Sequence, residues 1–278
     1  MRWKQWIVML ALGIALAAQA GLAQADGSTD DGIGAAVTLL RAEADAHRLI
    51  LLGEKHGTSE IPDLVEALVE EYAGDGPVLL GLEIPRTGHA ALRAYLHSDG
   101  GPDARAALLD TPFWRKSDDQ HDGRRSHDMV DLVDAVRSMR VAGSDVAILP
   151  YDVASAYGGD HHARDIAMAE RIRAAYRALP RGRLLVLGGN VHAMLARPDY
   201  APPEMQVPMG AYLLDLDPFA VDITAHGGWF WACNGTCAAM EELPKPTGSS
   251  RLDGRVYHLR IVLPRFSVAR LIGAGTAR

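Results

Sequence analysis

The chain has 278 residues, of which 48% are apolar, 23% are charged and 6% are aromatic. The apolar fraction excludes a disordered chain, and two cysteines are too few for a disulfide-rich scaffold or a four-thiolate zinc site. A formal net charge of −7 argues against a nucleic-acid partner, which needs a basic surface. These totals leave a globular protein of one or two domains.

Residues 1–25 are predicted to be a secretory signal peptide of bacterial type. Arg2 and Lys4 precede a mostly apolar stretch, and Ala23-Gln24-Ala25 fits the small-x-small rule for cleavage. A membrane anchor is the alternative, but polar residues interrupt the stretch and make it marginal for a span of about 20 residues. We therefore expect an exported protein, periplasmic or secreted, with one domain over residues 26–278 and no stable membrane span after cleavage.

Four short apolar runs predict buried strands, and three helical patterns lie between them. The runs cover residues 49–52, 78–82, 146–149 and 184–187, and the helical patterns cover 59–72, 127–141 and 161–179. Apolar runs without polar alternation suit strands covered on both faces, and strand–helix alternation favours a parallel sheet. Ser59 is the expected N-cap of the first helix. The sequence predicts an α/β fold with a mainly parallel central sheet and helices on both faces.

Two further segments depart from this pattern. Residues 99–125 are the least patterned and could form a helical insertion over one end of the sheet, with His121 and Arg124 near a site. Beyond residue 210, strand-like runs follow one another without helices between them, at 211–216, 220–224 and 256–263. We expect these runs to form an antiparallel C-terminal extension of the sheet.

The two cysteines are close together in the sequence. In an exported chain, Cys233 and Cys237 are expected to form a disulfide, because the intervening Asn234-Gly235 supplies a tight bend. A metal site built from two thiols this close is the weaker hypothesis.

Polar residues follow each of the four predicted strands at the point where the strand ends. They are Glu54, His56 and Glu60 after the first, Glu83 and Arg86 after the second, Tyr151 and Asp152 after the third, and Asn190 and His192 after the fourth. The carboxyl ends of parallel strands meet at one edge of an open α/β sheet, where ligands bind. We therefore expect a shared polar site, although each residue alone has an ordinary structural explanation such as a helix cap.

These residues also carry a resemblance to a known group of proteins. The elements are Gly53-Glu54-Lys55-His56-Gly57 with Glu60, Leu82-Glu83, Arg164-Asp165 with Met168-Ala169-Glu170, and Gly189-Asn190-Val191-His192. In order and spacing they resemble the erythromycin esterase-like/ChaN-like/Tiki superfamily, over residues 49–195. The resemblance implies an α/β sandwich with its site at the carboxyl edge of the sheet.

The resemblance implies three different activities. Erythromycin esterases use a Glu and His pair to activate water against a lactone. Tiki-type members are similar to metalloproteases, with a Gly-x-x-His motif that matches Gly53 to His56, and ChaN-like members bind haem and are linked to iron uptake. The chain lacks the lipobox cysteine of ChaN-like lipoproteins and the membrane anchor of Tiki proteins.

The first functional hypothesis is an exported hydrolase acting on an ester, lactone or amide of a small-molecule substrate. Glu54 or His56 would be the base and His192 its partner, while Glu83 would complete the carboxylate set. Arg86 would stabilise developing negative charge. Residues expected to bind substrate are Asn190, Asp152, Glu60, Arg164 and Tyr151. The structural alternative is that Arg86 forms a buried ion pair with Glu54 or Glu83.

Other residues of the third helical pattern are open to two interpretations. His161 and His162 could reach the site, but exposed histidines at a helix start are the simpler interpretation. Asp165 could act only on the electrostatics of the helix start.

Two cofactors are compatible with the candidate residues. His56, His192 and Glu83 make a His₂-carboxylate set that suits zinc or manganese. Haem, the alternative of the ChaN-like type, would use Tyr151 or Tyr157 and the aromatic run Trp229-Phe230-Trp231.

Overall fold

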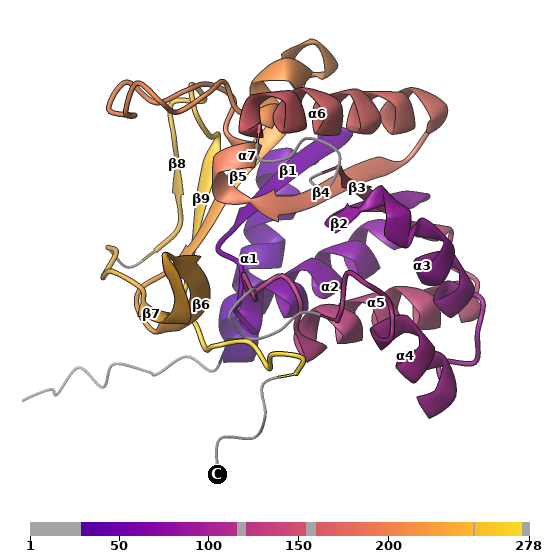
Figure 1. Cartoon of the computed structure of the whole chain (residues 1–278). Coiled ribbons are helices and arrows are strands. Elements are labelled where there is room, and N and C mark those ends of the chain that lie inside the picture. The colour runs from indigo at the N-terminus through magenta and orange to yellow at the C-terminus, as the bar shows by residue number, and fades with distance from the viewer. Residues whose placement is uncertain (1–28, 116–120, 154–159, 247, 274–278) are drawn as a thin grey trace, which may run out of the picture.

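The computed structural model describes residues 29–115, 121–153, 160–246 and 248–273 (Figure 1). The predicted signal peptide lies outside the described residues. Within the described ranges, no helix is long and apolar enough to cross a membrane.

A seven-stranded sheet forms the centre of the fold, in the order β3-β2-β4-β1-β5-β9-β8. The strands are β1 (Leu49–Glu54), β2 (Val78–Pro85), β3 (Val146–Asp152), β4 (Arg183–Gly189), β5 (Phe219–Ala225), β8 (Ser250–Arg251) and β9 (Leu259–Leu263). All neighbouring strands pair in parallel except β8, which is antiparallel to β9. The four strands expected from the apolar runs are confirmed, and each continues past its run, so that Glu54, Glu83 and Asp152 lie in strands.

Helices cover both faces of this sheet, as predicted. On one face lie α1 (Thr29–Ala44), α2 (Glu60–Ala73) and α5 (His127–Val141), with α3 (His89–Leu96) and α4 (Pro102–Leu109) beside α5. On the other lie α6 (His161–Ala178), the short α7 (Asn190–Ala193) and the 3₁₀ helix η4 (Met209–Leu216). Successive side chains of β1 point to opposite faces of the sheet. Ile50 packs in the core on the α2 side, and Leu51 packs in the core on the α6 side. Residues 102–109 of the unpatterned segment are therefore helical, as expected.

The structure corrects one of the predicted helix caps, that of α2. Ser126 Oγ accepts a hydrogen bond from Met129 N at 3.1 Å and caps α5, and Asp160 Oδ1 caps α6 through Ala163 N at 3.0 Å. Ser59 does not cap α2, because its own backbone is already helical (φ −82°, ψ −36°) and its side chain is turned to Val268 O.

The C-terminal part contains antiparallel pairs, but not all of those expected. Antiparallel pairing joins β8 to β9 and forms a separate hairpin of β6 (Trp229–Asn234) and β7 (Thr236–Glu241). Residues 211–216, expected as a strand, lie in η4, where Leu213 is buried against the α6 side of the sheet. β5 and β9 run parallel to β1, since the long connection between them brings the chain back to the same edge.

The predicted disulfide is confirmed at the tip of this hairpin. Cys233 and Cys237 face each other in the register of β6 and β7 and are joined. Gly235 makes the turn with a positive φ of 78°, a conformation that favours glycine.

Candidate active site

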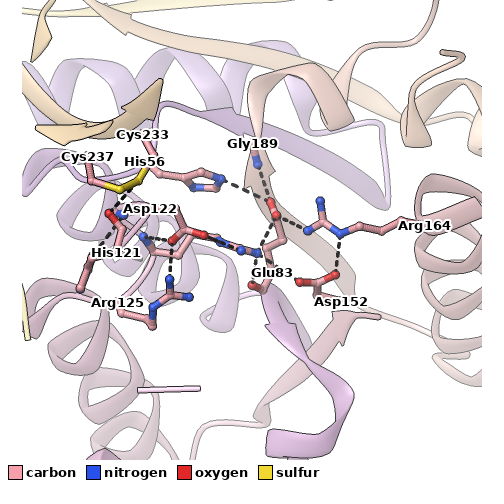
Figure 2. Close-up of polar contacts among 12 residues, drawn as sticks. His56, Glu83, His121, Asp122, Arg125, Asp152, Arg164, Gly189, Cys233 and Cys237 are labelled. Carbon is pink, nitrogen blue, oxygen red and sulfur yellow. Dashed lines mark hydrogen bonds and ion pairs between the residues drawn. A yellow bond between two sulfur atoms is a disulfide. The ribbon is translucent and has the colours of Figure 1, made fainter. Parts of the chain in front are cut away.

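The ends of the four parallel strands do bring the polar residues together. Glu83 of β2 lies at the centre, with Asp152 of β3 on one side and Gly189 of β4 on the other (Figure 2). His56 approaches from the loop after β1, and Arg164 reaches in from the first turns of α6.

Glu83 is a buried carboxylate that accepts three N–H groups. Its Oε1 accepts from Arg124 Nη1 at 2.9 Å and from Arg164 Nη2 at 2.6 Å, and its Oε2 accepts from Gly189 N at 2.8 Å. Burial alone would raise the pKa of Glu83, but Arg124, the nearby histidines and Arg164 hold it well below its usual range. Glu83 is therefore an anchored anion and not a proton acceptor near neutral pH.

Asp152 completes this arrangement from β3. It is fully buried, and its two oxygens accept from Arg164 Nε at 2.9 Å and Arg124 Nη1 at 3.1 Å. Two carboxylates and two guanidiniums thus form a buried quartet of Glu83, Asp152, Arg124 and Arg164. Such a network is costly to break, because removing one member leaves an uncompensated buried charge.

His56 is held by a carboxylate at each side of its ring. Its Nδ1 lies 3.0 Å from Glu54 Oε1, and its Nε2 lies 3.7 Å from Glu83 Oε2. Burial alone would lower the pKa of His56, but the charges of Glu54 and Glu83 outweigh it and raise the pKa above its usual value of 6.5. A histidine oriented by a carboxylate at Nδ1 is suited to exchange a proton at Nε2.

His192 has the same arrangement on the other side of Glu83. Its Nδ1 lies 2.5 Å from Asp165 Oδ1, and its Nε2 lies 3.1 Å from Arg164 Nη1. A guanidinium can only donate, so the contact with Arg164 uses the lone pair of Nε2 and leaves the proton on Nδ1. Asp165 therefore orients His192, which corrects the expectation that it acts only on the helix start.

The two histidines face one small space beside Gly189. A methyl group placed on Gly189 would lie 3.2 Å from His56 Nε2 and 3.5 Å from His192 Cδ2. A cleft of about 530 Å³ lies beside His192, and Asp165, Val191 and Met205 are also among its lining residues. His161 and His162 line the same cleft, so the simpler interpretation of them as plain helix-start residues is incomplete.

Arg124 enters the site from the unpatterned segment, on a loop that the disulfide hairpin supports. Asp122 Oδ2 accepts from Arg124 Nη2 at 2.6 Å. Burial alone would raise the pKa of Asp122, but Arg124 lowers it to about 2. Trp231 of β6 donates from Nε1 to His121 O at 2.6 Å, and its backbone N donates to Gly57 O at 3.0 Å. One strand of the hairpin therefore contacts both the loop that carries Arg124 and the loop that carries His56.

The disulfide lies against the same loop. Cys233 Sγ is 3.2 Å from His121 O, which is a packing contact because a disulfide sulfur has no proton to donate. Figure 2 shows the bridge between Cys233 and Cys237 beside His121.

Three residues expected at the site, Arg86, Glu60 and Tyr151, make contacts other than those predicted. Arg86 is exposed at the start of η1 (Arg86–Gly88) and, among the described residues, forms no ion pair with Glu54 or Glu83. The register of β2 against β3 is irregular between Leu82 and Pro85, directly before Arg86. Glu83, one of the two carboxylates expected to pair with Arg86, is instead bound by Arg124 and Arg164.

The side chains of the other two are hydrogen-bonded to the backbone. Glu60 is buried and accepts from Ser267 N at 2.9 Å, and Tyr151 is buried with its hydroxyl donating to Leu187 O at 2.9 Å. Asn190 begins α7 next to Gly189, and its backbone carbonyl accepts from the Tyr257 hydroxyl; substrate binding by its side chain stays a prediction.

The His₂-carboxylate metal set expected from the sequence does not fit these donors, and Tyr151 does not fit as a haem ligand. Among the residues that the structure describes, no group of three or more His, Cys, Asp or Glu side chains is arranged to hold a metal ion. Both oxygens of Glu83 are already engaged by N–H donors, so it is not a free ligand beside His56 and His192. For haem, burial and nearby carboxylates raise the pKa of Tyr151 well above its usual value, and its hydroxyl is bonded; Tyr157 lies outside the described residues.

Solved structures with the same arrangement of elements provide the comparison with known proteins. An erythromycin esterase, a variant of EreC in its open conformation, matches 84% of this chain and 95% of its own with a TM-score of 0.64 at 13% identity. The chain has the erythromycin esterase fold. This confirms, for the fold, the resemblance that the strand-end motifs indicate. No protein-family model matches the chain, and no curated protein does.

Two other solved structures share this fold. A Bacillus cereus protein matches 88% of this chain and 94% of its own with a TM-score of 0.62 at 12% identity. A succinoglycan biosynthesis protein matches 84% of this chain and 92% of its own with a TM-score of 0.59 at 11% identity. At these identities the likeness concerns the fold, so the chemistry has to be argued from the residues of this chain itself.

Proposed function

We propose that this protein is a hydrolase that cleaves an ester, lactone or amide with water activated by His56. The observation that supports this is the pairing of two imidazoles, each fixed at Nδ1 by a carboxylate, around one space beside Gly189. The erythromycin esterase fold is consistent with this chemistry. A cleft of about 530 Å³ beside His192 is large enough for a small-molecule substrate.

In the proposed reaction His56 is the general base. Its Nε2 takes a proton from water while the water oxygen forms a bond to the carbonyl carbon, and Glu54 stabilises the resulting imidazolium through Nδ1. The tetrahedral intermediate collapses by breaking the C–O or C–N bond. The leaving oxygen or nitrogen takes the proton back from His56, and the acid product is released.

Arg164 is the group suited to stabilise the developing oxyanion. Its Nη1 donates one of its two hydrogens to His192 Nε2, and a substrate oxygen placed beside Nη1 would accept a charge-assisted hydrogen bond from the other. His192 keeps this N–H group in place, while the other nitrogens of Arg164 are bound by Glu83 and Asp152. This assigns to Arg164 the task that the sequence suggests for Arg86.

The test is hydrolysis of a panel of esters, lactones and amides by His56→Ala and His192→Ala variants. Loss of the proton acceptor in His56→Ala is expected to lower kcat by about 10²–10⁴-fold, and His192→Ala is expected to lower it through the loss of the group that positions Arg164. His226→Ala is the matched control, because His226 is exposed and contacts Lys245 O away from the site. If His56→Ala keeps the activity of the unaltered protein, the proposal is wrong.

We also propose that the protein is exported after cleavage at residue 25. The predicted signal peptide and the Cys233–Cys237 disulfide support this, since disulfides persist in oxidising compartments. N-terminal sequencing of the protein recovered outside the cytoplasm should begin at Asp26. Recovery of the full chain in the cytoplasm with reduced cysteines would contradict export.

A further inference from the structure

Arg86 lies at the mouth of a second cleft, at the edge of the sheet between β3, α6 and η1. The cleft has a volume of about 610 Å³. Arg86 and Arg171 contribute guanidinium groups to its lining, and Leu149, Ala167 and Ala175 contribute apolar surface. The cleft is therefore amphipathic, within the size range of small-molecule sites.

The two guanidiniums of this cleft are not neutralised by the carboxylates around them. Arg86 is exposed and forms no ion pair within the described part of the chain. Asp152 also lines the cleft, but both of its oxygens are held in the buried quartet. Glu170, which is exposed, is the remaining carboxylate of the lining. Positive charge is thus in excess at the mouth.

Arg171 is oriented by a hydrogen bond to the backbone of β3. Its Nε donates to Pro150 O at 2.8 Å, which orients the guanidinium and leaves its terminal nitrogens to other acceptors. Burial lowers the pKa of Arg171, and the nearby charge of Arg86 lowers it further, so the two cations lie close enough to repel. An anion between them would relieve this repulsion.

We propose that this cleft binds an amphipathic anion, with a carboxylate or phosphate monoester head on a short apolar chain. Guanidinium groups bind both kinds of head through paired hydrogen bonds. The apolar chain would lie against Leu149, Ala167 and Ala175, which removes its surface from water. The site is distinct from the space between the histidines, and the inference does not depend on the proposed hydrolysis.

Calorimetric titration of the full chain with octanoate and with octyl phosphate tests the proposal. We expect at least one of them to bind, and the comparison identifies the preferred head group. Octanol and octylamine, which keep the apolar chain but lose or invert the charge, are expected to bind at least about tenfold more weakly. Octanol binding as tightly as both anions, or no binding by either anion, would overturn the proposal.

Variants of the lining locate the site. Arg86→Gln and Arg171→Gln are each expected to weaken anion binding about tenfold or more, and Ala167→Leu to weaken it by filling the apolar part. Arg93→Gln is the matched control, because Arg93 is an exposed arginine of α3 outside the lining. Arg171→Lys provides a second test if Arg171→Gln does not fold, since it keeps the charge and loses the paired geometry. Unchanged affinity in the Arg86→Gln protein would show that the anion binds elsewhere.

Discussion

Arg164 Nη1 lies 3.1 Å from His192 Nε2, although the two residues come from different segments after β3 and β4. This contact joins the buried quartet to the histidine pair. Arg164 uses its other nitrogens to bind Asp152 and Glu83, so its orientation is fixed by two strands at once. The position of a charge-stabilising donor is thereby set before a substrate arrives, which is the condition for efficient electrostatic catalysis.

Replacement of Arg164 by lysine is expected to lower kcat by about 10²–10³-fold, the effect of removing one positioned donor. Lysine keeps the positive charge, but its single nitrogen cannot reach Asp152, Glu83 and His192 together. The measurement is steady-state hydrolysis of the best substrate from the panel. Arg173→Lys is the control on the same helix, where Arg173 pairs with the exposed Asp215. A variant with full kcat would contradict the role given to Arg164.

Replacement of Asp165 by asparagine is expected to lower kcat by about 10²–10⁴-fold with little change in stability. The amide can donate to His192 Nδ1, which favours the tautomer with its proton on Nε2 and removes the lone pair that Arg164 needs. Asp199→Asn, at an exposed pair with Arg255, is the control. NMR of the imidazole nitrogens would report the change of tautomer directly. Unchanged kcat with an inverted tautomer would show that His192 is only structural.

The sequence predicts the part of this site that follows from strand periodicity. Glu54, Glu83 and His192 stand next to apolar runs, so the parallel-sheet rule alone places them at one edge. Arg124 has no such pattern, because its position depends on contacts between the loop after residue 120 and the hairpin of β6 and β7. Arg86 follows β2 as closely as the others do, but it is exposed and lines a second cleft. Side-chain direction at a strand end is a tertiary property that residue spacing does not encode.

The pH dependence of hydrolysis is expected to follow His56. The charges of Glu54 and Glu83 raise the pKa of His56 above its usual value of 6.5. The base therefore becomes active only as the pH rises through this raised pKa. Glu54→Gln removes one of these charges and should move the acidic limb of kcat to lower pH, while the plateau falls because the imidazolium is less stabilised. Glu70→Gln, at an exposed position of α2, should leave the limb unchanged. A limb that moves to higher pH in Glu54→Gln would contradict this assignment.

The stability of the protein is expected to fall in acid as Glu83 and Asp122 take up protons. The pKa of each is lower in the folded state than its usual value of 4.5 or 3.8, to about 2 for Asp122. Their contribution is therefore present above those usual values and is lost as the pH falls through the folded values. Denaturant unfolding between pH 5 and about pH 2 measures the loss. The Asp122→Asn protein should lose less stability over this range; an equal loss would assign the effect to other groups.

The disulfide hairpin is expected to position Arg124 and His56 as well as to stabilise the fold. A Cys233→Ser/Cys237→Ser protein should lose about 2 kcal/mol of unfolding free energy, the value for a closed loop this short.

Trp231→Phe keeps the ring packing but removes the N–H bond to His121 O, which costs about 1 kcal/mol and leaves the disulfide intact. If the hairpin positions the loop of Arg124, both variants lower kcat under conditions where they are fully folded. Trp229→Phe is the control, because Trp229 is partly exposed on the same strand. Full kcat in the folded Trp231→Phe and cysteine variants would limit the hairpin to a role in stability.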